Sequence, residues 1–152
     1  KMLRKILIIF FIPILFYGCG YSQLYSNTSN KNINIEVINS KGDQEINNYL
    51  LTNFKKYSGK QGKTFLLDID TSYSILDNSK NLEGSISSYQ LLSITTFEIQ
   101  SENFNKTITI QEDIIIKNLG DNLEKRNYEK SIKRNFGNSI SNKLILQLSS
   151  IQ

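Results

Sequence analysis

Residues 64–75 read TFLLDIDTSYSI, and the pattern in this stretch decides the fold. Apolar and polar residues alternate along it, and a period of two is typical of a β-strand with one buried face. The apolar face holds Phe65, Leu67, Ile69, Tyr73 and Ile75, and the polar face holds Asp68, Asp70, Ser72 and Ser74. The stretch therefore predicts a strand that is wet on one side and covered on the other.

Two more strands follow in the same style. Ser85 to about Ser101 is the first, with an apolar face made of Tyr89, Leu91, Phe97 and Ile99. Lys106 to Lys117 is the second, with Ile108, Ile110, Ile114 and Ile116 on one face. The intervening segments DNSKNLEG and ENFN are polar turns. Three successive strands joined by short turns predict an antiparallel meander with one wet face.

The segments around the meander supply a fourth strand and the cover. Ile33–Ile38 alternates and predicts a strand. The next segment predicts a helix, with Asp43 as N-cap, Gly59 as stop, and an apolar face of Ile46, Leu50, Phe54 and Tyr57. Residues 121–151 predict a long second helix with an apolar stripe of Ile132, Phe136, Ile140, Leu144 and Leu148, and Gly137 predicts a bend in its middle. The fold class is therefore α+β, with two helices packed on one face of a four-stranded, mostly antiparallel sheet in the order β-α-β-β-β-α.

The beginning of the chain has the pattern of an export signal. Lys1, Arg4 and Lys5 precede about a dozen apolar residues, Ile6–Tyr17. A membrane-spanning helix needs roughly twenty, so the run fits the core of a secretory signal better than an uncleaved anchor or a buried helix. Gly18-Cys19 then resembles a lipobox, where cleavage precedes a cysteine that carries diacylglycerol. The sequence predicts a lipoprotein signal peptide over 1–18, a lipidated N-terminus and flexible tether over 19–32, and a single α+β domain over 33–152.

Net charge gives little support for a nucleic-acid partner. The formal charge of the chain is +4, and Lys1, Arg4 and Lys5 of the predicted signal account for three of those charges, which leaves +1 for Cys19–Gln152. A nucleic-acid-binding domain needs a basic face on its folded part. We therefore expect a membrane contact through the lipid on Cys19 and no nucleic-acid partner.

The sequence offers few groups for catalysis. It contains no histidine, the usual general base at neutral pH, and one cysteine. It has no glycine-rich phosphate loop and no G-x-S-x-G motif. Two pairs of carboxylates, Asp68 with Asp70 and Glu112 with Asp113, could hold a cation or share a proton, but a polar strand face produces such pairs routinely. We predict no enzyme activity, no catalytic residues, no cofactor and no metal.

Five cations gather in the second predicted helix, at Lys125, Arg126, Lys130, Lys133 and Arg134. They could contact lipid phosphates or nucleic acid. Acidic residues are interleaved with them, however, and Glu129 stands four residues before Lys133 in the favourable orientation of a helical ion pair. A solvated helix face is the preferred interpretation.

Two stretches carry a resemblance to a known family. The first is CGYSQLY at Cys19–Tyr25, and the second is TITIQEDIIIK at 107–117 together with the helix NLEKRNYEKSIKRNFGNSISNKLILQL at 122–148. Together with the order of elements, they resemble the lipopolysaccharide-assembly lipoprotein family LptE in its alphaproteobacterial form, over essentially the whole chain from Cys19. No lipopolysaccharide-contacting residue can be carried over. Lys80, in a predicted turn, is an exposed cation of the kind that could meet a phosphate, and a chance position on the surface explains it equally well.

The resemblance implies a non-enzymatic protein held in the outer membrane by its lipid and facing the periplasm. Proteins of this family plug the LptD-type outer-membrane β-barrel, help it to assemble, and take part in lipopolysaccharide delivery to the outer leaflet. The expected partners are thus that barrel and lipopolysaccharide. A free-standing periplasmic lipoprotein, which binds a ligand or scaffolds another envelope complex, is the alternative.

Overall fold

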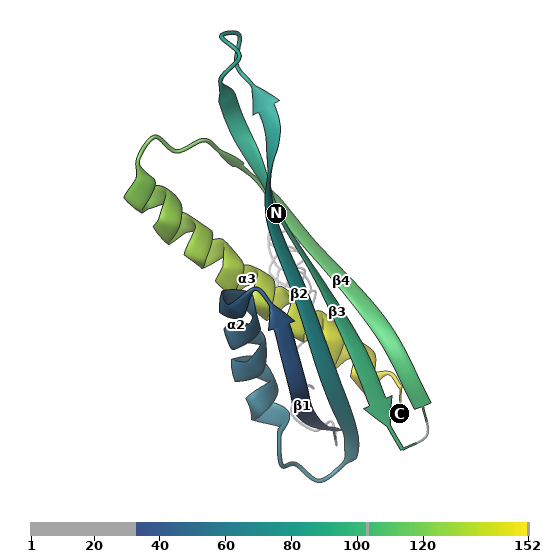
Figure 1. The fold of residues 1–152 in the computed structure, drawn as a ribbon. Coiled ribbons are helices and arrows are strands. Elements are labelled where there is room, and N and C mark those ends of the chain that lie inside the picture. Colours follow the sequence, from purple (N-terminus) through teal and green to yellow (C-terminus); the bar gives the residue numbers. More distant parts are fainter. Residues whose placement is uncertain (1–32, 103, 152) are drawn as a thin grey trace, which may run out of the picture. The chain divides into compact units, whose positions relative to one another are not determined.

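A computed structural model describes residues 33–102 and 104–151, within a unit that spans Lys31–Gln152 (Figure 1). The predicted signal peptide, Cys19 and the tether lie outside the described residues. The elements are β1 (Ile33–Gly42), α2 (Gln44–Phe54), the 3-10 turn η3 (Lys55–Tyr57), β2 (Lys63–Lys80), β3 (Ile86–Ser101), β4 (Phe104–Lys117) and α3 (Asn122–Ser149). This α+β order confirms the prediction from the sequence.

The four strands form one sheet in the order β1-β2-β3-β4. β2, β3 and β4 are the predicted antiparallel meander. β1 is parallel to β2, and a parallel pair needs a crossover connection, which α2 provides. The sheet is therefore mixed, with one parallel pair beside a long antiparallel ribbon.

The period of two in β2 and β3 places their apolar residues on one face. Ile69 pairs with Phe97, which pairs in turn with Ile108, so these three side chains form one row across the sheet. All three are buried. On the opposite face Asp70 and Glu98 are exposed. We call these the covered face and the open face.

The two helices bury the covered face. α2 contributes Ile46, Leu50 and Phe54 to the core, and the Phe54 ring meets the Phe97 ring edge-on with 6.1 Å between centroids. α3 contributes Ile132, Phe136, Ile140, Leu144, Ile145 and Leu148. α2 and α3 also pack against each other (Figure 1).

Close helix packing explains the glycine inside α3. A Cβ atom at Gly137 would stand 2.6 Å from the Cβ of Tyr49 on α2, which is far inside van der Waals contact. Nearby, the Asn53 amide donates hydrogen bonds of 2.9 Å to Ser141 and Asn138 on α3. The glycine therefore permits the two helices to approach, a role that the predicted bend did not anticipate.

The β2–β3 hairpin is longer than the sequence predicted. Residues 77–84 were expected as a turn, but β2 continues to Lys80 and only residues 81–85 turn. Hydroxyl contacts extend the pairing, because Ser79 Oγ lies 2.7 Å from Ser87 Oγ and 2.6 Å from Ser88 Oγ. The side chain of Asn81 closes the turn by accepting from the backbone of Glu83 and Ser85. Polar composition marked the turn but overestimated its length.

Both helices begin at an aspartate N-cap. The Asp43 carboxylate accepts from the Ile46 backbone N–H at 2.9 Å, as the sequence predicted. Asp121 does the same for α3, accepting from Leu123 and Glu124 at 2.7 and 2.9 Å. These bonds from Glu124 and Leu123 lower the pKa of Asp121, since they favour its charged form.

Candidate functional site

The end of the sheet that carries the β2–β3 hairpin reaches past β1 and α2 (Figure 1). We call this region the distal end and define it by Ile75, Leu76, Lys80, Leu82, Tyr89, Ile114, Ile115 and Lys117. The register brings these residues together, because Ile75 pairs with Leu91, which pairs with Ile114. Leu76, Gln90 and Ile115 form the adjacent row, which faces the other way.

Large apolar side chains of the distal end are open to solvent. Ile75 and Ile114 are 41% and 38% exposed, and on the opposite face Leu76 and Ile115 are 45% and 57% exposed. Leu82, in the hairpin turn, is 109% exposed relative to its reference state. Single exposed apolar residues are ordinary, but a cluster of them marks an interaction site. The distal end carries such residues on both faces of the sheet, with Ile75 and Ile114 on the covered face and Leu76 and Ile115 on the open face.

Cations accompany this apolar cluster. Lys80 lies at the end of β2, beside the turn that holds Leu82, and Lys117 ends β4; both are exposed. Neither takes part in an ion pair within residues 33–102 and 104–151. Asp77 and Glu83, on the same hairpin, limit the net positive charge of the distal end. The distal end thus combines exposed apolar surface with free ammonium groups.

The first third of α3 is held near this end by few contacts. No side chain between Asn122 and Ser131 is fully buried. Lys125 places its ammonium 4.4 Å from the centre of the Tyr89 ring, a cation–π contact worth roughly 0.5–1 kcal/mol at an exposed site. The position of this segment therefore depends on the residues at its base.

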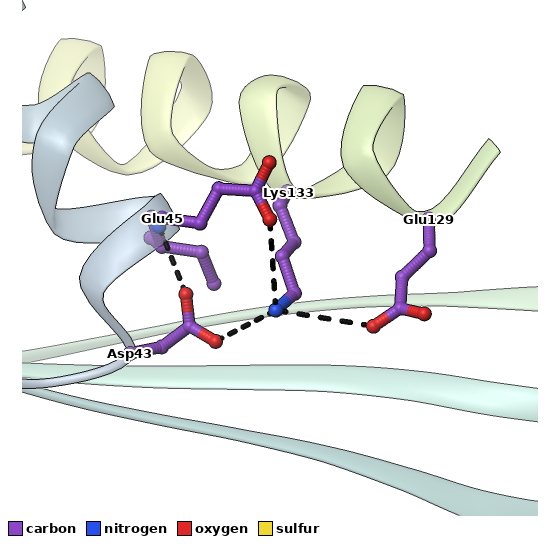
Figure 2. A network of polar contacts seen from close by, with 5 residues as sticks. Asp43, Glu45, Glu129 and Lys133 are labelled. Carbon is purple, nitrogen blue, oxygen red and sulfur yellow. Dashed lines mark hydrogen bonds and ion pairs between the residues drawn. The ribbon is translucent and has the colours of Figure 1, made fainter. Parts of the chain in front are cut away.

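Lys133 is the main contact at that base (Figure 2). Its Nζ lies 2.8 Å from Asp43 Oδ2, 3.9 Å from Glu45 Oε2 and 3.8 Å from Glu129 Oε1. It also stands 4.3 Å from the centre of the Tyr73 ring. Only 14% of the Lys133 side chain is exposed. This one ammonium group joins α3, the start of α2 and β2, and we call the five residues the Lys133 cluster.

The Lys133 cluster carries an excess of negative charge, because three carboxylates surround one cation. Burial raises the pKa of the Tyr73 phenol well above its ordinary value, and the negative charge of Glu129 raises it further. Glu129 lies near the phenol, but no hydrogen bond of standard geometry links them, and the buried hydroxyl is without a partner in the described residues. Tyr73 therefore stays neutral and serves as a ring beneath Lys133. The arrangement fixes a helix and offers no acid–base pair.

The five cations of α3 do not share one environment. Lys133 is nearly buried, so the solvated-face interpretation was wrong for this residue, although its ion pair with Glu129 is confirmed. Arg134 lies over Tyr49, 6.0 Å from the ring centre. Arg126 and Lys130 are exposed, as expected. The inward turn of Lys133 was not visible in the sequence, since its partners Asp43 and Tyr73 are remote along the chain.

The structure separates one of the two carboxylate pairs. Glu112 lies on the covered face and contacts Lys143 Nζ at 2.6 Å and Ser139 Oγ at 2.7 Å. Asp113 lies on the open face and accepts from Gln90 Nε2 at 3.0 Å. Adjacent residues of a strand point to opposite faces, so these two carboxylates do not form a site.

Asp68 and Asp70 do share the open face. They line a hollow of about 430 Å³ with Asn39, Lys41, Ile69, Thr96 and Glu98. Asp68 pairs directly with Glu98. Within residues 33–102 and 104–151, no group of three or more His, Cys, Asp or Glu residues has the arrangement of a metal site. No helix in the same ranges is long and apolar enough to cross a membrane.

Solved structures with a similar fold include two bacterial proteins described as lipoproteins. Rare lipoprotein B from Shewanella oneidensis is 9% identical with a TM-score of 0.57, over 76% of this chain and 98% of that one. An uncharacterized lipoprotein B from Nitrosomonas europaea is 12% identical with a TM-score of 0.60, over 81% and 88% of the two chains. At such identities the likeness establishes the fold alone. No protein-family model and no curated protein matches the sequence.

Proposed function

We propose that the protein is a lipid-anchored envelope protein that plugs and helps to assemble an LptD-type outer-membrane β-barrel and takes part in lipopolysaccharide delivery. It acts as a binding protein, without catalysis or cofactor, from the periplasmic side of the outer membrane. The shared fold with rare lipoprotein B supports this proposal, as does the lipobox-like Gly18-Cys19.

The distal end is the observation that carries the proposal. Lipopolysaccharide presents acyl chains and phosphates, so a protein that handles it needs apolar surface next to cations. Leu76, Leu82 and Ile115 provide the apolar surface, and Lys80 and Lys117 provide ammonium groups without ion-pair partners in the described residues. Charged hydrogen bonds to phosphate are short and strong.

The open face suits the barrel part of the proposal. Its middle is polar, with Asp70, Ser72, Glu98 and Thr109 exposed. Such a face is compatible with a water-filled barrel lumen, whose wall is polar. A scaffold lipoprotein that stands free in the periplasm needs the lipid anchor but no barrel.

A co-purification experiment separates these two functions. The tagged full-length protein is extracted from outer membranes in mild detergent and the co-purifying proteins are identified. The plug function predicts a large β-barrel protein in near-equal amount. If a lipidated and folded bait brings down no such barrel, the free-standing lipoprotein is the better description.

Replacing Leu82 by serine is expected to weaken binding to lipopolysaccharide about tenfold. Burial of a leucine side chain contributes roughly 1.5–3 kcal/mol, and 1.4 kcal/mol corresponds to a factor of ten. Binding is measured on immobilised lipopolysaccharide by surface plasmon resonance. Ile38→Ser is the matched control, because Ile38 is 59% exposed on β1, outside the distal end. Equal loss in both variants would contradict a binding role for the distal end.

The Cys19→Ala variant tests the anchor. We expect metabolic labelling with a clickable palmitate analogue to mark the natural chain and not the variant, because the alanine has no thiol to acylate. Labelling that persists in Cys19→Ala would place the lipid elsewhere or remove the lipoprotein assignment.

A further inference from the structure

The outer edge of β4 is long and regular. β4 pairs with β3 along its whole length, from Ser88 opposite Lys117 to Ser101 opposite Phe104, without a bulge. It stands last in the sheet order, so its other side has no strand partner in the described part of the chain. A row of unpaired backbone N–H and C=O groups is a template for another strand.

The opposite edge of the sheet is protected in ways that β4 is not. The register of β1 shifts between Val37 and Asn39, and bulges of this kind discourage edge pairing. Near the start of β1, the Asn34 side chain accepts a 2.8 Å hydrogen bond from the Gly59 backbone N–H. The loop after η3 therefore lies against the start of β1. The β4 edge has no bulge, although its exposed Lys106 and Lys117 are charges of the kind that blunt a sheet edge.

One hydrogen bond shows which β4 groups point outward. The Asn118 backbone N–H donates to Ser87 O at 2.9 Å, so this pair, next to Ser88–Lys117, is a hydrogen-bonded pair of the antiparallel ladder. Such pairs alternate with non-hydrogen-bonded ones. The even-numbered residues of β4 therefore bond to β3, and the odd-numbered residues from Asn105 to Lys117 direct their N–H and C=O groups away from the sheet.

We propose that β4 pairs with β4 of a second copy of this chain, antiparallel and centred on Thr109. Over residues 104–114 this register puts Lys106 of each copy opposite Glu112 of the other. It also puts Ile108 opposite Ile110 on the covered face. Opposite charges and apolar residues that face each other across strands stabilise a pair, and the two-fold symmetry makes each contact twice.

Other registers are poorer. A centre at Glu112 or Asp113 places identical carboxylates directly opposite each other, which is destabilising. A centre at Ile115 matches Asp113 with Lys117 but pairs only residues 113–117. Only the registers centred on Thr109 and on Ile115 place opposite charges across from each other, and the one centred on Thr109 pairs more residues.

α3 adds apolar surface beside this edge. Ser139 and Lys143 contact Glu112 of β4, so their side of α3 faces that strand. Leu146 comes seven residues after Ser139 and three after Lys143, so it lies on the same side of α3. Its side chain is 46% exposed. A second copy at the β4 edge would cover Leu146. The pairing is independent of the proposed function.

The oligomeric state tests the pairing. The full chain in mild detergent is analysed by size-exclusion chromatography with light scattering at tens of micromolar, where we expect a dimer. Lys106→Glu should raise the dissociation constant at least tenfold, and Lys117→Glu, an exposed lysine of the same strand outside residues 104–114, should not. A monomer at every concentration, or equal sensitivity to both changes, would overturn the proposal.

A cysteine at the centre of the pair tests the register. In a Cys19→Ser background, Thr109→Cys should form a disulfide-linked dimer on mild oxidation, because directly opposed residues of a hydrogen-bonded pair lie about 5.5 Å apart at Cα, within disulfide range. Ser72→Cys, exposed on β2 away from the edge, is the control. A dimer that links equally through both positions, or through neither, would refute pairing at Thr109.

Discussion

Replacing Lys133 by methionine is expected to lower the free energy of unfolding by about 3 kcal/mol, because it leaves partly buried carboxylates without their cation. Methionine keeps most of the length of the side chain, so the loss of charge is the main change. The largest part of the loss should come from Asp43, since its side chain is only 16% exposed and its carboxylate lies 2.8 Å from the ammonium group. Urea denaturation followed by circular dichroism measures the effect.

Lys130→Met is the matched control, since Lys130 is exposed on the same helix, and it should change stability by less than about 0.5 kcal/mol. A similar loss in both variants would show that the Lys133 cluster does not hold α3.

Alkali should lower the stability of the natural chain through the phenol of Tyr73. The folded pKa of this phenol is raised above its unfolded value, so its contribution to stability is complete below the ordinary tyrosine pKa. That contribution is lost as the pH rises above the ordinary value, where the unfolded chain ionises first.

The Gly42→Ala variant is expected to lose about 3 kcal/mol of stability, from a left-handed backbone and an overpacked contact. Gly42 has a φ of +89°, and a Cβ there would overlap the carbonyl oxygen of Thr71. That carbonyl accepts from the Asp43 N–H at 2.9 Å, so backbone on both sides must move. The change would also displace Asp43 from Lys133. Chemical denaturation measures the loss.

Gly84→Ala separates the two contributions. Gly84 has a φ of +82° but has no atom within 4 Å of the position of an added Cβ. We expect it to lose about 1 kcal/mol from backbone conformation alone. Equal losses at both positions would mean that the clash at Thr71 is relieved without cost.

The sequence predicted the fold because its local patterns agree with each other. Alternation in residues 64–75, the Asp43 cap and the four-residue recurrence from Ile132 each report a feature that depends on near neighbours in the chain. The length of the hairpin was missed because Ser79 and Ser88 stabilise it across the two strands, where composition alone suggests a turn. The role of Gly137 depends on Tyr49 of another helix, which no local pattern reveals.

The candidate site was less accessible from the sequence. Lys80 was identified as an exposed cation, but its apolar neighbours Leu76 and Ile115 meet only through the register of three strands. Lys133 was assigned to solvent because its helical neighbours are charged, whereas its buried partners come from α2 and β2. Long-range pairing therefore limited the prediction in both cases.

The single parallel pair has a consequence for the order of folding. β2, β3 and β4 join through short connections, so their pairings close small loops and should form early. β1 can pair with β2 only after the chain has passed through α2, and non-local pairings of this kind form slowly. In amide exchange pulsed during refolding, protection should then appear later in β1 than in β3. Because Asp43 lies at the junction of β1 and α2, its contact with Lys133 should be made only when this late step is complete.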